Sequence, residues 1–175
     1  ADMLYQMHVP YNSERALEIA ERVMGFIQEE SYEASKYLAD ERGVFENFNK
    51  SVYKTHEGCA YRNATTTTIA PTGTLSIIAG CSSGIEPLFA FSFVRHVMDN
   101  DELLEVNPYF ESVAKERGFY SRELMDIIAQ KGTIRDLNEI PEDVREVFVT
   151  SHDVSPEWHI RMQAAFQKFT DNAVS

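Results

Sequence analysis

Six consecutive residues carry the groups best suited to binding an anion. They are Pro71, Thr72, Gly73, Thr74, Leu75 and Ser76. Proline fixes one backbone angle, and glycine permits a close approach that other residues resist. Three of the six side chains end in a hydroxyl group that can donate a hydrogen bond. The composition is that of a loop that holds a phosphate group through backbone N–H groups and hydroxyls.

The flanking residues predict how this loop is presented. Residues 65–69 are β-branched without interruption, which favours a strand covered on both faces. Residues 75–79 are mostly apolar and precede Gly80, which predicts a short helix. A strand, a turn and a helix start leave several N–H groups free, and the helix dipole adds about 0.3–1 kcal/mol per favourable charge. The alternative is an ordinary buried strand with a tight turn, because one glycine turn is a weak motif.

Other elements are predicted on both sides of the loop. Residues 88–97 favour a second buried strand, in which Phe89, Phe91 and Phe93 fall on one side. Before the loop, a long helix is predicted from residue 12 or 13 to about residue 42. Its apolar stripe consists of Leu17, Ala20, Met24, Ile27, Ser31, Ala34 and Leu38. This stripe favours a core-facing surface over a coiled-coil seam, because sustained heptads and flanking charge patterns are missing.

Capping signals predict four further helices. They begin at Asn107-Pro108, Ser121, Pro141 and Ser155-Pro156, and Gly118 and Gly132 close the first two. Residues 1–11 give no clear signal. Besides the short helix at residues 75–79, the sequence alone therefore predicts about five helices and two strands, and two strands do not form a stable sheet by themselves.

Other reactive residues do not form a recognisable site. Ser151, His152 and Asp153 have the letters of a hydrolase triad, but such triads are assembled by the fold from distant residues. His152 and His159 lack a matching set of acid and cysteine ligands, so no metal site is expected. Cys59 and Cys81 are not spaced for zinc or a disulfide framework, which fits a reducing, cytoplasmic setting.

Composition narrows the class of protein further. The chain has 175 residues, enough for one domain with a sizeable core, and a formal net charge of −12. This charge argues against nonspecific binding to nucleic acid. No apolar run reaches the length of a membrane span, so neither nucleic acid nor a membrane is expected as a partner.

The amino-acid sequence of the central segment resembles that of a known protein family. Residues 64–90, which contain Pro71-Thr72-Gly73-Thr74-Leu75-Ser76 and end in Gly84-Ile85-Glu86-Pro87-Leu88-Phe89-Ala90, closely resemble the catalytic subunit of ribonucleotide reductases. The likeness is strongest to the adenosylcobalamin-dependent class II enzymes. It continues through Val149-Thr150-Ser151-His152-Asp153 and Ser155-Pro156-Glu157-Trp158-His159, and it covers essentially the whole chain.

The resemblance implies a fold and a role for the loop. The fold class is α/β, and residues 1–175 are expected to form one incomplete domain, a mostly helical part of a ten-stranded α/β barrel. The strands at residues 65–70 and 88–97 are expected to flank the phosphate-binding turn. In the family, the loop that matches Pro71, Thr72, Gly73, Thr74, Leu75 and Ser76 binds the phosphate group of the ribonucleotide substrate.

Departures from the family pattern are equally informative. The loop that carries the family's radical cysteine is absent, as are the cysteines that donate and restore electrons. Neither Cys81 nor Cys59 matches any of them. No catalytic or metal-binding residue is therefore expected in this chain, which we expect to be part of a longer protein and inactive alone.

The implied function is a share in converting ribonucleotides to deoxyribonucleotides by thiyl-radical chemistry. The intact enzyme is expected to use adenosylcobalamin, with the rest of the barrel and a thiol reductant such as thioredoxin as partners, and the chain alone is expected to bind no cofactor. Three alternatives remain: a class I reductase subunit, a stand-alone phosphate- or nucleotide-binding module without catalysis, and a helical interaction protein with no preference for anions.

Overall fold

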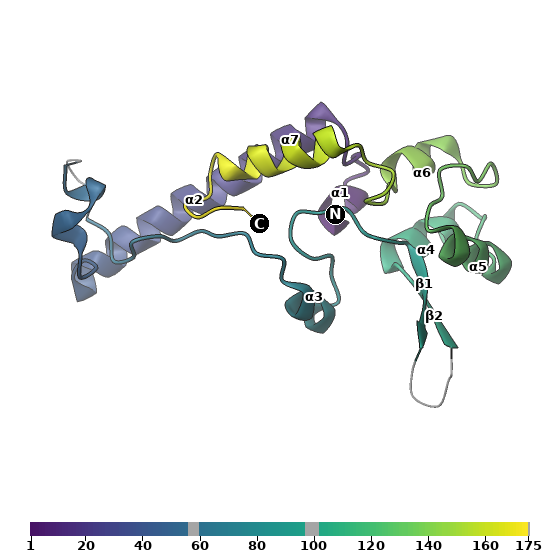
Figure 1. The fold of residues 1–175 in the computed structure, drawn as a ribbon, viewed down its shortest axis with the longest axis horizontal. Helices are drawn as coiled ribbons and strands as arrows, with labels where there is room; N and C mark the ends of the chain where they lie inside the picture. The colour runs from purple at the N-terminus through teal and green to yellow at the C-terminus, as the bar shows by residue number, and fades with distance from the viewer. Residues whose placement is uncertain (56–59, 97–101, 175) are drawn as a thin grey trace. The chain divides into compact units, whose positions relative to one another are not determined.

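The computed structural model describes residues 1–55, 60–96 and 102–174. The chain divides into two compact units. The first consists of residues 1–16 and 72–160, and the second of residues 17–71 and 161–175. Helices dominate, with one small sheet (Figure 1). Cys59 lies outside the described residues.

The first unit contains most of the short elements. In chain order they are α1 (Asp2–Gln6), α3 (Gly73–Ala79), β1 (Ser92–His96), β2 (Glu102–Val106), α4 (Pro108–Glu116), α5 (Arg122–Lys131) and α6 (Glu142–Val147). The two strands pair antiparallel, with Ser92 opposite Val106 and Val94 opposite Leu104. Helix α5 packs against both strands. The hairpin is thereby supported by a helix, which a lone pair of strands needs for stability.

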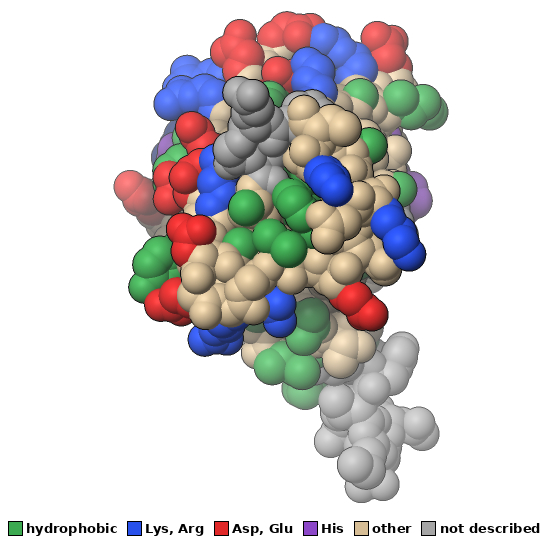
Figure 2. All heavy atoms as spheres, turned by 90° about the vertical axis from the view of Figure 1, so that its left-hand side faces the viewer, with side chains coloured by type: hydrophobic (Ala, Val, Ile, Leu, Met, Phe, Trp, Pro, Cys, Tyr) green, Lys and Arg blue, Asp and Glu red, His purple; other side chains and the backbone are tan. Residues whose placement is uncertain are grey.

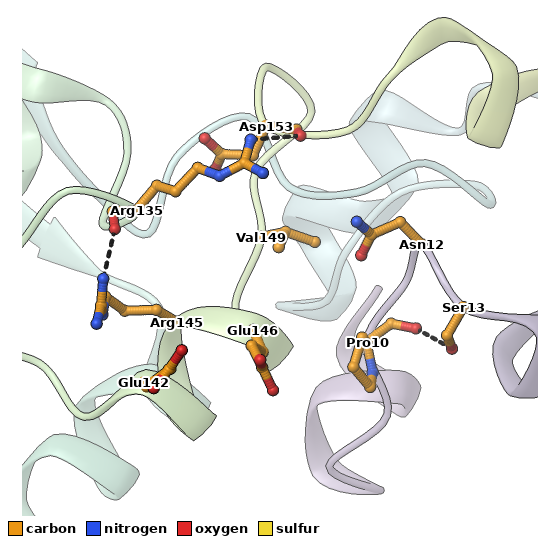
Figure 3. A pocket seen from close by; sticks show the side chains of 9 residues that line it. All are labelled: Pro10, Asn12, Ser13, Arg135, Glu142, Arg145, Glu146, Val149 and Asp153. Carbon is orange, nitrogen blue, oxygen red and sulfur yellow. Dashed lines mark hydrogen bonds between the residues drawn. The ribbon is translucent and has the colours of Figure 1, made fainter.

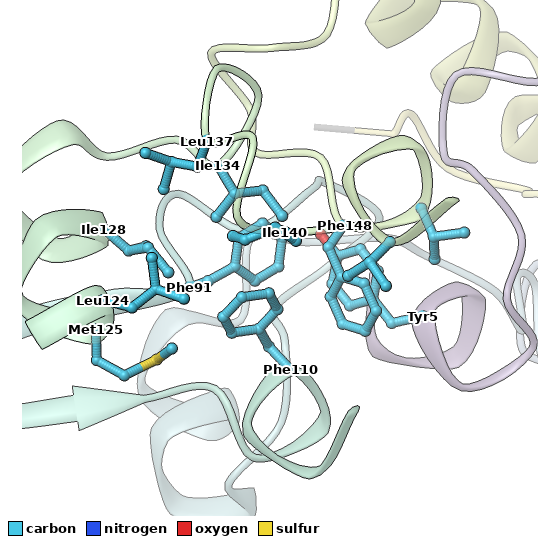
Figure 4. Close-up of a cluster of buried hydrophobic side chains, with 12 residues drawn as sticks. Tyr5, Phe91, Phe110, Leu124, Met125, Ile128, Ile134, Leu137, Ile140 and Phe148 are labelled. Carbon is cyan, nitrogen blue, oxygen red and sulfur yellow. The ribbon is translucent and has the colours of Figure 1, made fainter. Parts of the chain in front are cut away.

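An aromatic cluster forms the centre of this unit's core (Figure 4). Tyr5 stacks on Phe148 with ring centroids 5.1 Å apart, and Phe91 meets Phe110 and Phe148 at 5.4 and 5.6 Å. Each of these four side chains is at most 1% exposed. Burial of such a side chain contributes about 1.5–3 kcal/mol, and aromatic pairs add to it. The N-terminal segment is therefore anchored in the core through Tyr5.

Capping residues set the bounds of the later helices. Asn107 accepts hydrogen bonds from the N–H groups of Tyr109 and Phe110, both at 3.1 Å, at the start of α4. Ser121 accepts one from Leu124 N–H at 3.0 Å at the start of α5, and Gly132 ends that helix with a φ of 73°. These cap predictions are confirmed.

The second unit contains most of α2 (Glu14–Arg42), two short 3₁₀ helices, η1 (Phe48–Lys50) and η2 (Val52–Thr55), and the second half of α7 (Pro156–Gln167). Gly25 of α2 faces the Phe169 ring, 3.5 Å from where a Cβ would lie. Lys168 and Glu21 form an ion pair. These contacts bring the end of the unit's chain against α2.

The predicted stripe of α2 is right at its start and wrong further on. Leu17, Ala20 and Met24 are buried, but Ile27 is 46% exposed and Ala34 is exposed. Ser35 and Ala39 are buried in place of Ala34 and Leu38. The predicted spacing averaged 3.5 residues per turn, whereas a straight helix has 3.6, so the stripe drifts around the helix over several turns.

The prediction of a mostly helical barrel fragment is confirmed, but the strands lie elsewhere than expected. Residues 65–70 form no strand, and only Ile69 makes an isolated parallel bridge, with Val174. A strand requires hydrogen-bonded neighbours along its length, and the described residues provide one bridge partner. The second predicted strand begins at Ser92, not at residue 88, and pairs with the unpredicted β2.

The expected one-sided phenylalanine row is also wrong. Phe91 is 1% exposed, whereas Phe89 is 72% and Phe93 is 43% exposed. Phe89 and Phe91 lie before the strand begins, so its period of two does not apply to them.

Charged side chains of both signs are interspersed on the face shown in Figure 2. Arg117 binds Asp143 through two bonds, of 2.8 and 3.2 Å, and Lys115 pairs with Glu111 at 2.8 Å. Such exposed pairs contribute little to stability. Within the described residues, no helix is both long enough and apolar enough to cross a membrane.

Candidate phosphate-binding site

Thr72 adopts an unusual backbone conformation immediately before α3. Its φ and ψ are 48° and 30°, in the left-handed region. Branching at Cβ makes this region unfavourable for threonine, and such strain costs on the order of 1–3 kcal/mol. Its carbonyl accepts from Ser76 N–H at 2.9 Å, and its Oγ1 accepts from Gly84 N–H at 3.3 Å. Strained residues of this kind cluster at ligand-binding sites and switches.

The first turn of α3 has free hydrogen-bond donors. Among the described residues, no hydrogen bond is made by the N–H groups of Gly73, Thr74 or Leu75. All three residues are exposed. The N-terminal N–H groups of a helix have no partners within the helix, and they favour an anion. The predicted short helix is confirmed, and Gly80 ends it with a φ of 63°.

Gly73 itself is not where the positive φ occurs. The turn places that angle on Thr72, and a Cβ built on Gly73 meets nothing within 4 Å. Glycine is thus not required at position 73 by the backbone angle or by neighbours in the described chain. The remaining reason for a glycine is close approach by a group outside the chain.

The three hydroxyls of the loop differ in availability. Thr74 is exposed, and its hydroxyl makes no hydrogen bond to another described residue. Thr72 Oγ1 accepts one bond and keeps its own hydrogen free. Ser76 donates its hydroxyl hydrogen to the Gly73 carbonyl at 2.7 Å, so it is already committed within the helix. The structure therefore favours Thr72 and Thr74 over Ser76 as hydroxyl donors, while Pro71 and Leu75 are exposed beside them.

The segment that follows α3 is held by the N-terminal residues. Tyr11 Oη donates to the Ile85 carbonyl at 2.9 Å. Tyr5 Oη donates to the Val149 carbonyl at 2.9 Å and accepts from Leu88 N–H at 3.5 Å. Burial raises the pKa of Tyr5 and of Tyr11, so both phenols stay protonated and able to donate. These anchors were not predicted from the sequence, because tyrosine donors follow no motif.

A shallow cavity of about 410 Å³ lies beside α3. Ser76, Cys81, Ser82, Glu86 and Phe89 are among its lining residues. Cys81 has a free, exposed thiol. The cavity is of a size for a small molecule. It adjoins the helix that begins at the candidate loop, through Ser76.

A second cavity, of about 380 Å³, lies elsewhere in the first unit (Figure 3). Arg145 donates to the carbonyls of Arg135 and Ile140 at 2.8 and 3.0 Å, and Arg135 donates to the Asp153 carbonyl at 3.4 Å. Both guanidinium groups thus bind backbone, and carboxylates of Glu142, Glu146 and Asp153 line the same space. This mixture does not favour any one class of ligand.

The described residues give no support for a hydrolase triad or for a metal site. Asp153 accepts bonds from Thr133 Oγ1 and from Thr150 N–H and Oγ1, at 2.7 to 2.9 Å. His152 packs edge-on against Phe89, with centroids 5.0 Å apart. His152 and Asp153 therefore contact different partners, as expected for residues that do not form a triad. In the described part of the chain, no three His, Cys, Asp or Glu side chains are grouped as a metal site.

Comparison with known proteins gives a consistent result. The family model of the ribonucleotide reductase barrel domain matches residues 1–60 and 56–175. The vitamin B12-dependent ribonucleoside-diphosphate reductase of Thermoplasma acidophilum is 55% identical over the whole chain, which covers 22% of that protein. The enzyme of the same name from Mycobacterium tuberculosis H37Rv is 45% identical over the whole chain, which covers 24% of it.

More distant relatives have other names. The ribonucleoside-diphosphate reductase subunit alpha of Chlamydia pneumoniae is 26% identical over 99% of the chain and 20% of that subunit. Among solved structures, the class Id ribonucleotide reductase alpha subunit of Actinobacillus ureae matches with a TM-score of 0.78 and 25% identity. That match covers 96% of this chain and 29% of the subunit. The chain thus spans about a fifth to a quarter of its curated relatives' length, and it belongs to the ribonucleotide reductase barrel-domain family.

Proposed function

We propose that this chain is the substrate-phosphate-binding part of the barrel domain of an adenosylcobalamin-dependent ribonucleoside-diphosphate reductase. The observation that carries the proposal is the turn at Thr72, which opens the first-turn N–H groups of α3 to the outside. Family membership supplies the substrate class. The chain is 55% identical to part of a B12-dependent enzyme and 26% identical to part of a subunit alpha, which favours the cobalamin-dependent class.

The loop's part in the reaction is binding and orientation. The N–H groups of Gly73, Thr74 and Leu75 donate to phosphate oxygens, and the free hydroxyls of Thr72 and Thr74 add two donors. Donors to a charged group contribute about 1.5–3 kcal/mol each. Fixing the diphosphate in this way places the ribose relative to groups outside this chain, where the reacting atoms lie. No residue of this chain is assigned a catalytic role.

The radical initiator and the reductant are a cofactor and a partner of the intact protein, and neither is assigned to this chain. The cavities described above, of about 380 and 410 Å³, are small for a corrin, so no described residue is assigned to hold cobalamin. When bound, adenosylcobalamin supplies the radical that starts ribose reduction. A thiol reductant of the thioredoxin kind restores the enzyme after each turnover. We place the whole protein in the cytoplasm and residues 1–175 in one barrel domain.

Reduction assays of the intact enzyme test this function. Formation of deoxyribonucleoside diphosphate should require added adenosylcobalamin. It should proceed with ribonucleoside diphosphates as substrate and a dithiol as reductant. Activity that is independent of cobalamin but requires a separate metal-bearing subunit supports the class I alternative instead. Nucleotide binding without reduction under either condition supports a module that binds but does not catalyse.

A further inference from the structure

Asp2 is a buried acidic residue that the phosphate chemistry does not use. Only 8% of its surface is exposed. Its Oδ2 accepts a hydrogen bond from Ser82 N–H at 2.7 Å, and its own N–H donates to Ser82 Oγ at 3.1 Å. Two reciprocal bonds therefore tie α1 to the segment just after Gly80, the residue that ends α3.

Helix α3 depends on such ties because it is short and buries none of its residues. Leu75, Ile77 and Ile78 are 65%, 73% and 77% exposed. A seven-residue helix is not stable in isolation, so contacts at its ends decide where it lies. At its start, Thr72 Oγ1 binds Gly84 N–H. Past its end, Asp2 of α1 binds Ser82 N–H, two residues after Gly80, and Tyr5 of the same helix binds Leu88 N–H further on.

The bond from Asp2 differs in kind from the neighbouring anchors. Tyr5 and Tyr11 bind Leu88 and Ile85 as neutral phenols. The carboxylate of Asp2 makes a charge-assisted bond, which is shorter and stronger. Its other oxygen, Oδ1, is buried and has no partner among the described residues. Ser82 N–H is the partner that the described residues give this carboxylate, while Ser82 Oγ also accepts from the Ala1 amino group at 3.3 Å.

We propose that Asp2 is a positioning residue for the phosphate loop: its buried carboxylate fixes Ser82 and, through Ser82, the helix α3 whose first turn binds substrate phosphate. The proposal rests on the phosphate-binding function assigned above. Asp2 touches no substrate. It acts by reducing the number of positions that α3 samples before the substrate arrives, which is the structural form of preorganisation.

The test uses the intact reductase and two substitutions of Asp2. Asp2→Ala removes the acceptor for Ser82 N–H, whereas Asp2→Asn keeps an oxygen acceptor. Asp2→Ala should raise the KM for a ribonucleoside diphosphate about tenfold or more, because phosphate donors are no longer aligned. The kcat should stay within about twofold, as expected when uniform binding is lost. In Asp2→Asn, the KM should return most of the way to the wild-type value.

Ser121→Ala is the matched control. It removes the cap bond of α5 in the same unit, away from residues 72–88, and costs stability without changing the tie to α3. Amide hydrogen exchange of the peptide that covers residues 73–82 should speed up in Asp2→Ala and not in Ser121→Ala. If Asp2→Ala does not fold, Ser82→Ala provides the test, because it removes the acceptor of Asp2 N–H. It should also raise the KM, but by less than Asp2→Ala.

Several results overturn the proposal. An unchanged KM in Asp2→Ala, an equal rise in Ser121→Ala, or no recovery in Asp2→Asn contradicts a positioning role. Gly73→Val, measured in parallel, distinguishes failure of the phosphate assignment from failure of the role of Asp2. If its KM is unchanged, the phosphate assignment fails and the role of Asp2 fails with it. If its KM rises while that of Asp2→Ala does not, the role of Asp2 alone is wrong.

Discussion

Substitution of Gly73 separates binding from folding. The open space around this residue means that a side chain here meets no other described atom within 4 Å. Gly73 is the first residue of α3 and does not have a positive φ. Alanine or valine at this position is therefore compatible with the fold. Any loss of function must come from what approaches the residue from outside.

Substitution of Gly73 should change stability and phosphate affinity in opposite directions. Gly73→Ala should stabilise the protein by about 0.4–1 kcal/mol, because the unfolded chain loses freedom. Gly73→Val adds bulk where the phosphate is expected, so at least one charge-assisted bond is lost. That loss is about 1.5–3 kcal/mol, or roughly 10- to 150-fold in affinity. Loss of all three N–H bonds abolishes measurable phosphate binding.

The assay is equilibrium binding of a ribonucleoside diphosphate and of the corresponding nucleoside to the intact reductase. Gly73→Val should weaken binding of the diphosphate and leave binding of the nucleoside unchanged. Thermal unfolding should show no loss of stability. Unchanged diphosphate affinity refutes the reasoning. So does a lowered Tm in Gly73→Val, because the side chain then meets another part of the protein and not a ligand.

Three further predictions follow from single contacts. Thr74→Ala should weaken diphosphate binding by about 1.5–3 kcal/mol, since one hydroxyl donor is lost, and Thr74→Ser should retain affinity; equal weakening in both variants contradicts a hydroxyl bond. Asn107→Ala removes the cap that accepts from Tyr109 and Phe110 N–H, and should lower the free energy of unfolding by about 0.5–2 kcal/mol in denaturant titrations; an unchanged midpoint argues against the cap. Burial opposes ionisation of Asp171, but bonds from Thr66 N–H, Tyr32 Oη and Thr67 N–H outweigh it and hold the pKa of Asp171 below its ordinary value. Its contribution to stability is therefore present above the unfolded pKa and is lost as pH falls through the lower folded one, so Asp171→Asn should flatten the stability profile below about pH 4, and an unaltered acid profile contradicts the assignment.

Local signals in the sequence predicted local structure well. The caps at Asn107 and Ser121 depend on side chain to backbone bonds within three residues, so they need no knowledge of the fold. The ends of the short helix before Gly80 and of the long helix before Gly43 were predicted from the glycine itself, which has a positive φ at both positions. The six-residue loop was found because its composition and its family likeness agreed.

Non-local features were missed or misplaced. The β-branched residues 65–69 favour a strand, but strand formation is decided by neighbours that lie far away in the chain. The left-handed angle at Thr72 was not predicted, because threonine rarely adopts it. Asp2 and Ser82 are 80 residues apart, and no local pattern reveals a bond between them.

A crystal structure of the intact reductase with a bound ribonucleoside diphosphate would show directly whether the loop binds phosphate. We expect phosphate oxygens within about 2.7–3.2 Å of the N–H groups of Gly73 and Thr74, with Thr72 still in the left-handed region. A diphosphate bound elsewhere, with these N–H groups facing solvent or another protein segment, contradicts the assignment of the loop and the role of Asp2 that depends on it.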